Sequence, residues 1–131
     1  MTVIDTSCVV DFLLGVGSAD QVESLMAGEG ELAAPDVLVF EAMAVLRRAA
    51  LRGALAEARA AGAIDDLGDV AVELFPSLPL RQRAWSLHRN LTSADALFVA
   101  LAEQLEEPLA TKDSALAAEL AKHSAVEVLN L

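Results

Sequence analysis

The chain opens with Thr2-Val3-Ile4-Asp5-Thr6-Ser7, where apolar residues suited to a buried strand run directly into an acid and two hydroxyls. The stretch 2–4 predicts a short strand, and the apolar pattern that follows Asp5 predicts a helix through Leu14. Gly15 then ends this helix. A strand that passes without a long loop into a helix is typical of α/β proteins.

The alternation of strands and helices continues outward from this opening to the carboxyl end. Further strands are expected at 31–34, 70–75, 109–111 and 126–129, and further helices at 18–27, 36–52, 54–67, 80–90, 93–106 and 114–122. Asp36 is expected to cap its helix, and Gly62 is expected to interrupt another. The pattern predicts a three-layer α/β/α fold, with a mainly parallel sheet between two layers of helices.

Length and composition restrict the class of protein further. The chain has 131 residues, 55% of them hydrophobic, and we expect one domain spanning residues 1–131. No apolar block reaches the roughly 18 residues that a membrane span needs, and the first residues do not resemble a secretory signal. The single cysteine, Cys8, excludes an intramolecular disulfide. We therefore expect a cytoplasmic protein with no membrane segment.

The net charge of -11 argues against nucleic-acid binding through a basic surface. The argument is incomplete, because enzymes that cut phosphodiesters through metal ions need local acids, and the bound ions reverse the local field. Six of the nine basic residues fall into two groups, which on surface statistics are expected to be solvated helix faces: Arg47, Arg48 and Arg52, and Arg81, Arg83 and Arg89.

Four acids lie in apolar sequence, where a carboxylate is least expected: Asp5, Glu41, Asp95 and Asp113. Glu41 is the clearest case, because its neighbours one helical turn away in both directions are all apolar. A buried, unpaired carboxylate is strongly disfavoured, so each of these groups needs a cation, a hydrogen-bond donor or a function.

The predicted fold brings these acids to one edge of the sheet. Asp5 and Asp113 follow strands, and Glu41 and Asp95 are expected in the first turns of helices that enter from the same edge, provided that the connections are right-handed. Oxygen ligands without nearby His or Cys favour Mg²⁺ or Mn²⁺ over Zn²⁺. The hydroxyls of Ser7 and Thr111 are candidates for orienting a carboxylate or holding a metal-bound water.

Simpler interpretations of the same residues remain open. Asp5 and Asp113 have the positions of helix N-caps, and Asp95 stands three residues after Thr92, the spacing of a capping box. Ser7 and Thr111 also suit local capping. We exclude Asp11 from the site, because six positions along a helix are expected to carry it away from the strand end.

The acids and their neighbours form a pattern that covers essentially the whole chain: Val3–Ser7, Pro35–Val37 with Glu41 and Leu46–Arg48, Thr92–Glu103, and Leu109–Asp113. This pattern resembles the PIN-domain ribonucleases of the VapC toxin type. The third block is the most specific.

The resemblance implies a PIN-like α/β/α domain that cleaves RNA endonucleolytically with Mg²⁺ or Mn²⁺. It also implies a homodimer that a cognate antitoxin neutralises. By position, Asp5 and Asp95 resemble the principal metal ligands, with Glu41 and Asp113 completing the acidic pocket. Ser7 and Thr111 resemble supporting hydroxyls. The metal-bound water would then attack the scissile phosphate in line.

Three other kinds of protein are alternatives to this interpretation. A phosphoacceptor receiver domain would need adjacent acids after the first strand, and a haloacid-dehalogenase-like phosphatase would need an acid at position 7, where this chain has Ser7. Neither pattern fits. A catalytically inactive PIN-like module, acting in interaction or RNA binding, remains the main alternative.

Overall fold

The computed structural model describes residues 1–28 and 30–131 and contains one sheet of five parallel strands. The strands are β1 (Thr2–Ile4), β2 (Leu32–Pro35), β3 (Val72–Phe75), β4 (Leu109–Thr111) and β5 (Val128–Asn130), in the spatial order β3-β2-β1-β4-β5. All four neighbouring pairs are parallel. The predicted α/β fold is therefore confirmed, and the bounds of β2, β3 and β5 differ from the predicted ones by one or two residues.

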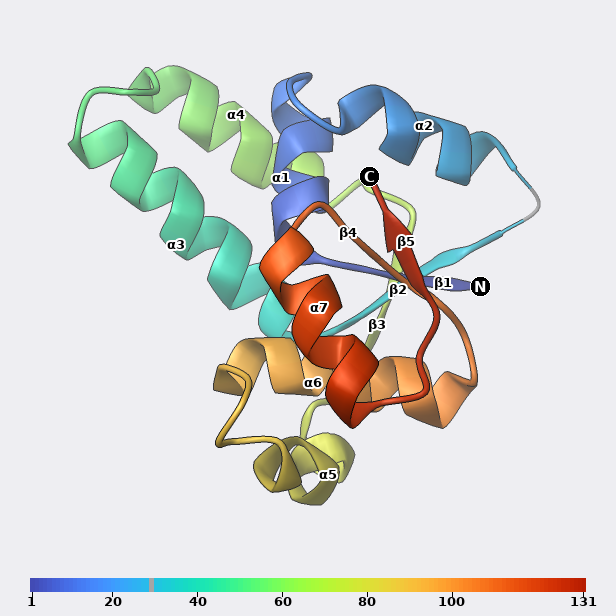
Figure 1. The fold of residues 1–131 in the computed structure, drawn as a ribbon. Helices are drawn as coiled ribbons and strands as arrows, with labels where there is room; N and C mark the ends of the chain where they lie inside the picture. Colours follow the sequence, from blue (N-terminus) through green and yellow to red (C-terminus); the bar gives the residue numbers. More distant parts are fainter. Residues whose placement is uncertain (29) are drawn as a thin grey trace.

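In the described part of the chain, seven α-helices connect these strands. They are α1 (Thr6–Leu14), α2 (Ala19–Ala27), α3 (Val37–Leu51), α4 (Glu57–Leu67), α5 (Arg81–Ser86, after a 3₁₀ turn at Leu78–Leu80), α6 (Ser93–Leu105) and α7 (Ser114–His123). In Figure 1, α1, α2 and α4 lie on one side of the sheet and α5, α6 and α7 on the other. This is the predicted three-layer arrangement. Among the described residues, every helix is too short or too polar to span a bilayer.

Three details of the helices differ from the predictions. Helix α4 runs through Gly62 without interruption, because one glycine costs only about 1 kcal/mol in a helix. The helix expected at 80–90 ends at Ser86, where the N–H groups of Leu87 and His88 bond the carbonyls of Ala84 and Trp85 in tighter, 3₁₀-type turns. Asp36 does not cap α3: its carboxylate accepts hydrogen bonds from the backbone N–H and the hydroxyl of Ser77, which the pairing of β2 with β3 brings alongside.

The direction of the connections creates a crevice at the carboxyl edge of the sheet. From β1 the chain moves through β2 to β3 by way of α1–α4, then returns across the sheet to β4 and β5 by way of α5–α7. The helices that follow β1 and β4 therefore lie on opposite faces of the sheet. In open parallel sheets such a switch point is where ligands bind.

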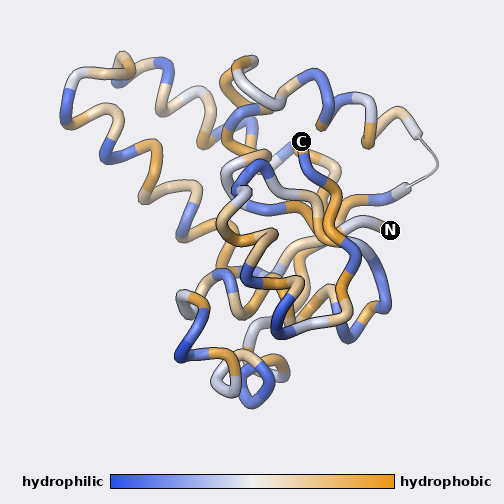
Figure 2. The backbone as a smooth tube through the Cα atoms, viewed as in Figure 1, coloured by the Kyte–Doolittle hydropathy of each residue, from blue (hydrophilic) through white to orange (hydrophobic). Residues whose placement is uncertain are grey.

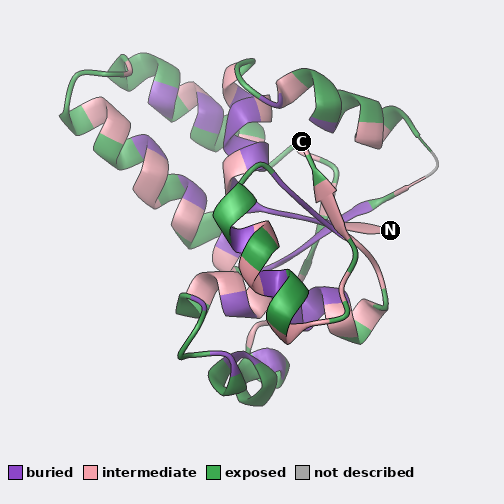
Figure 3. Ribbon diagram, in the orientation of Figure 1, coloured by how far each residue is buried: buried purple, intermediate pink, exposed green. Residues whose placement is uncertain are grey.

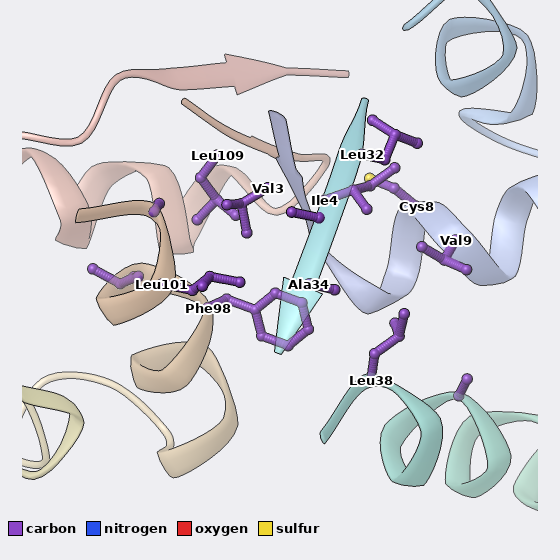
Figure 4. Close-up of a cluster of buried hydrophobic side chains, with 14 of the residues drawn as sticks. Val3, Ile4, Cys8, Val9, Leu32, Ala34, Leu38, Phe98, Leu101 and Leu109 are labelled. Carbon is purple, nitrogen blue, oxygen red and sulfur yellow. The ribbon is translucent and has the colours of Figure 1, made fainter. Parts of the chain in front are cut away.

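The core fills both sides of the three central strands. Figure 4 shows Ile4, Leu38 and Phe98 among the packed side chains, and each is almost completely buried. Burial falls toward the edges, since β3 and β5 are only partly covered while β2 and β4 are buried throughout (Figure 3). Along the outer helices, hydrophobic and hydrophilic residues alternate (Figure 2), as expected for helices that cover a sheet with one face.

Candidate active site

The four predicted acids meet in one hollow at the carboxyl ends of β1 and β4. The hollow has a volume of about 280 Å³, and Asp5, Glu41, Asp95 and Asp113 all contribute to its lining. They come from the end of β1, from α3, from the start of α6 and from the turn after β4. The convergence predicted from the sequence is therefore present in the fold.

Asp5 is the most buried of the four, with 8% of its surface exposed. Its Oδ1 accepts a hydrogen bond of 2.8 Å from the Thr6 N–H, which makes it the N-cap of α1, and its Oδ2 accepts one of 2.8 Å from the Thr111 hydroxyl. Burial raises the pKa of Asp5, and these hydrogen bonds offset only part of the rise. The N-cap interpretation is thus correct, and it leaves Asp5 at the hollow.

The two supporting hydroxyls differ in strength. Thr111 is fully buried and lies at hydrogen-bond distance from Asp5, whereas the Ser7 hydroxyl donates to Asp5 Oδ2 over 3.4 Å. Thr111 Oγ1 also accepts from the Asp113 N–H at 3.1 Å. Thr111 therefore links the two acids that follow β1 and β4, and Ser7 contributes a weaker contact.

Glu41 lies one turn deeper in its helix than predicted, because it is the fifth residue of α3. It is half-buried, and its Oε1 accepts a hydrogen bond of 2.7 Å from the Thr6 hydroxyl. Burial raises the pKa of Glu41, and the negative charge of Asp5 adds to the rise. Sequence reasoning missed the role of Thr6, since 35 residues separate it from its acceptor.

Asp95 has the most perturbed carboxyl group in the hollow. Burial and the charge of Asp5, with smaller contributions from Glu41 and Asp113, raise the pKa of Asp95 to about 6. The predicted capping interaction is also present: Thr92 is the N-cap of α6, and its hydroxyl accepts from the Asp95 N–H at 3.2 Å. This cap uses the backbone of Asp95, while its side chain borders the hollow.

Asp113 is the N-cap of a helix and also lies at the rim of the acid-lined hollow. Its Oδ1 accepts a hydrogen bond of 3.0 Å from the Leu116 N–H, which makes it the N-cap of α7. The residue is exposed and is the outermost of the four acids. The N-cap interpretation is confirmed here as well, and Asp113 still contributes negative charge to the hollow.

Asp11, which the sequence analysis excluded, lines the same hollow. It is 6% exposed and accepts hydrogen bonds from the Ser18 N–H and hydroxyl, both at 2.9 Å, and from Lys112 Nζ at 2.8 Å. Burial opposes ionisation, but the bonds from Lys112 and Ser18 outweigh it and hold the pKa of Asp11 below its usual value. The signal was available in the sequence, because Asp11 stands between Val10 and Phe12 in an apolar helix.

The hollow is suited to a divalent cation by its donor chemistry. Carboxylates that burial and mutual repulsion hold above their ordinary pKa values become easier to ionise when a cation is bound. Among the residues described, no group of three or more His, Cys, Asp or Glu side chains is already arranged around a common point. Mg²⁺ does not need one, because it commonly keeps several waters and takes one or two protein carboxylates.

A larger hollow, of about 900 Å³, lies between α6, α7 and β5. Its charged groups compensate one another: Arg83 forms hydrogen bonds of 2.8 Å to both carboxylate oxygens of Glu103, and the Ser124 hydroxyl donates to the same carboxylate. This hollow has no comparable cluster of acids with raised pKa values. We therefore assign the chemistry to the smaller hollow.

Comparison with known proteins gives a consistent family. The family model described as "PIN domain" matches residues 2–122. The chain is similar to Ribonuclease VapC1 of Mycobacterium tuberculosis, with 40% identity over 117 residues, which is 88% of each chain. The residues that the family model matches include all four acids.

Solved structures share the fold at lower identity. A toxin-antitoxin complex from Klebsiella pneumoniae aligns with a TM-score of 0.66 and 19% identity, covering 99% of this chain and 97% of that chain. VapBC2 from Rickettsia felis, bound to a DNA fragment from its promoter, aligns with a TM-score of 0.71 and 12% identity, covering 98% and 97%. At these identities the likeness shows the fold alone.

Proposed function

Because this chain belongs to the PIN-domain family, we propose that it is a metal-dependent endoribonuclease and the toxin of a VapBC-type toxin-antitoxin pair. The observation that carries the proposal is the pairing of Asp5 with Asp95. Their charges meet in one hollow, and the pKa of Asp95 is raised to about 6 by burial and by Asp5. The 40% identity to a relative named as a ribonuclease supports the same activity.

Asp5 and Asp95 would hold Mg²⁺ or Mn²⁺, with Glu41 and Asp113 contributing directly or through water. A bound ion supplies activation of water for in-line attack on the scissile phosphate and stabilises charge on the leaving oxygen. The protein contributes orientation, since Thr111 fixes Asp5 and Thr6 fixes Glu41.

RNA is the proposed substrate, and the net charge of -11 restricts how it is held. Few basic side chains are available to neutralise phosphates along a long tract. A short or structured RNA, bound by a small number of contacts, fits this surface better than an extended one. Phosphate groups near the cut would approach the acids only when a cation is bound.

The proposed protein partners are a cognate antitoxin and a second copy of this chain. The likeness to a toxin-antitoxin complex and to VapBC2 supports the antitoxin. An antitoxin arginine inserted among the acids would compensate them, because a guanidinium binds paired carboxylates through two hydrogen bonds. A cytoplasmic location is also proposed, since the lone cysteine, Cys8, is buried and free.

The test is cleavage of a mixed structured-RNA pool by the purified chain with Mg²⁺ or Mn²⁺, with and without a chelator. Asp95→Asn is the key variant, and Asp65→Asn, at an exposed acid of α4, is the matched control. Cleavage that requires both the metal and Asp95 supports the nuclease. Metal and RNA binding without any cleavage would favour the catalytically inactive module instead.

A further inference from the structure

Helix α5 and its flanks differ in charge from the rest of the molecule. The stretch Leu74–Ala94 is the longest part of the sequence without an acid, and it holds three of the nine basic residues, Arg81, Arg83 and Arg89. The rest of the chain therefore carries all 20 acids against six basic residues. In a protein with a net charge of -11, a region of the opposite sign is a candidate for binding an anion.

Two aromatic rings are stacked on this region. The rings of Trp85 and His88 lie parallel, with centroids 4.1 Å apart and an interplanar angle of 5°. The His88 Nδ1 lies 2.7 Å from the Trp85 carbonyl oxygen, so this nitrogen carries a proton and donates it. Trp85 is nevertheless 69% exposed. The stack is held in place from within its own turn, and most of the tryptophan ring remains open to solvent on a helix that is largely exposed (Figure 3).

Two arginines remain available beside the stack. Arg83 is occupied by Glu103 and by the His123 carbonyl, and so contributes little to anion binding. Arg81 donates one hydrogen bond of 3.0 Å to the Leu78 carbonyl, which leaves most of its guanidinium donors for a ligand. Arg89 is exposed at the end of the same segment.

The stack and the acid-lined hollow both border the first turn of α6. Arg81, Trp85 and His88 line a depression of about 190 Å³ together with Ser93, the first residue of α6. Asp95 follows Ser93 by two positions, which is about 200° around a helix. The two residues therefore occupy opposite flanks of the same first turn. A nucleic-acid strand crossing the amino end of α6 would border both the hollow and the stack.

We infer that Trp85 is a base-stacking platform for single-stranded RNA, with Arg81 and Arg89 binding the adjacent phosphates while the acid-lined hollow holds the phosphate to be cut. The inference rests on the proposed function. Aromatic faces bind bases of any sequence by stacking, and arginine binds phosphate through paired hydrogen bonds. A few contacts of this kind would hold RNA on an otherwise acidic protein.

The charges favour RNA over a second copy of this chain as the occupant. In a two-fold symmetric contact the same patch meets itself, so Arg81 and Arg89 of both copies would approach one another. A polyanion with unstacked bases satisfies both the arginines and the exposed ring.

The chain provides its own probe, because Trp85 is its only tryptophan and it contains no tyrosine. We would titrate Asp95→Asn, which leaves the RNA intact, with a single-stranded oligonucleotide of mixed sequence, about ten nucleotides long, and with the matching duplex. The expected result is quenching of Trp85 fluorescence by the single strand and much less by the duplex. Binding of the single strand without any change in Trp85 fluorescence would overturn the inference.

Variants test the contribution to affinity, measured by anisotropy of labelled RNA. Trp85→Ala is expected to weaken binding by about tenfold, and Trp85→Phe to restore most of the loss. Leu51→Ala is the matched control, because Leu51 is 66% exposed and lies on α3 outside the patch. Equal affinities for Trp85→Ala and Leu51→Ala would contradict the platform.

Two further outcomes separate this inference from the proposed function. Cleavage that depends on Asp95 but proceeds normally in Trp85→Ala would remove the platform and leave the ribonuclease. The absence of both RNA binding and cleavage in the unaltered chain would remove both. A Trp85 emission that shifts with protein concentration without RNA, together with a monomeric Trp85→Ala, would assign the patch to contact between copies.

Discussion

Two acids in the same hollow, Asp11 and Asp95, have opposite electrostatic environments. Asp11 receives three hydrogen bonds, one of them from the ammonium group of Lys112, and its pKa lies below the usual value. Burial of the Asp95 carboxyl group and the nearby charge of Asp5 raise the pKa of Asp95 to about 6. The protein compensates one carboxylate with its own cation and leaves the other uncompensated.

This difference distinguishes an acid whose charge the fold compensates from one whose ionisation the fold opposes. A buried charge that is paired and fully hydrogen-bonded can be retained for the fold, because its desolvation is offset within the protein. A cluster of acids without a cation lowers stability, so it is informative when a fold keeps one. The Asp95 side of the hollow is consequently the place where an external cation has the most to contribute.

The largest expected effect is loss of cleavage in Asp95→Asn. Removing a carboxylate that binds the catalytic ion should lower the rate by about a thousandfold, since each tenfold corresponds to about 1.4 kcal/mol of the barrier. The metal-free variant should also be more stable than the unaltered chain by about 1 kcal/mol, because repulsion with Asp5 is gone. Cleavage assays and urea unfolding measure the two effects. A variant that is equally active would contradict the assignment of Asp95.

Asp11→Asn should show the reverse pattern. Loss of the charge-assisted bonds from Lys112 and Ser18 is expected to lower the free energy of unfolding by about 2 kcal/mol. Lys112→Met should cost about 1 kcal/mol, because Lys112 is partly exposed and Ser18 still serves Asp11. Neither change removes a proposed metal ligand. If Asp11→Asn keeps full stability but loses Mg²⁺-dependent activity, the two acids do not have distinct roles.

The free energy of unfolding should depend on pH in opposite ways through Asp95 and Asp11. Asp95 has a folded pKa of about 6 against an ordinary value of 3.8, so the folded state binds more protons between these values, and stability falls as pH rises through about 6. After allowance for solvent screening, the metal-free chain should gain at most about 1 kcal/mol between pH 7.5 and pH 5. Asp11 acts oppositely, and its contribution is lost only as pH falls below its ordinary range.

Mg²⁺ should cancel this gain on acidification. Binding to ionised carboxylates stabilises the folded state more at pH 7.5 than at pH 5, where Asp95 takes up a proton. Urea unfolding at both pH values, with and without Mg²⁺, measures the effect. In Asp95→Asn the pH dependence between these values should be much smaller, and an unchanged dependence would show that another group is responsible.

A smaller and more local effect than the loss of either acid is expected from Gly17→Ala. Gly17 has φ +52°, and an added Cβ would press against the Asp11 carboxylate. The strain should cost about 1 to 2 kcal/mol and loosen the contact of Asp11 with Ser18. Gly62→Ala is the matched control, because it lies in α4 with open space around it and should instead stabilise by about 1 kcal/mol. Thermal unfolding of both variants decides the sign.

Much of the fold was predictable because its signals are local. The strand at Thr2–Ile4 and the helices around Asp95 and Asp113 follow from apolar periodicity, and their caps follow from residues one to three positions away. The error at the end of α5 also has a local cause, but this cause lies in backbone hydrogen bonding rather than in the apolar pattern. Helix α5 ends at Ser86, where the N–H groups of Leu87 and His88 bond carbonyls three residues back, and no apolar pattern reveals this tightening.

The candidate site was predictable in its members but only partly in their roles. The four acids were recognisable as charges in apolar sequence, and the order of strands brought them together as expected. The same criterion applied to Asp11, and an assumption about helix direction excluded it. Helix α1 and Lys112 in fact lie against each other at the switch point between β1 and β4.

The sequence by itself determined the alternation of strands and helices, the four acids and their positions at strand and helix ends, because these depend on neighbours within a few residues. Only the tertiary structure decided which acid would have a cation of its own. Lys112 reaches Asp11 across 101 residues of sequence, and the Thr111 hydroxyl reaches Asp5 across 106. Such pairings depend on which strands are adjacent. In a buried site of low dielectric constant, gaining or lacking a hydrogen-bond or charge partner then changes the free energy of a carboxylate strongly.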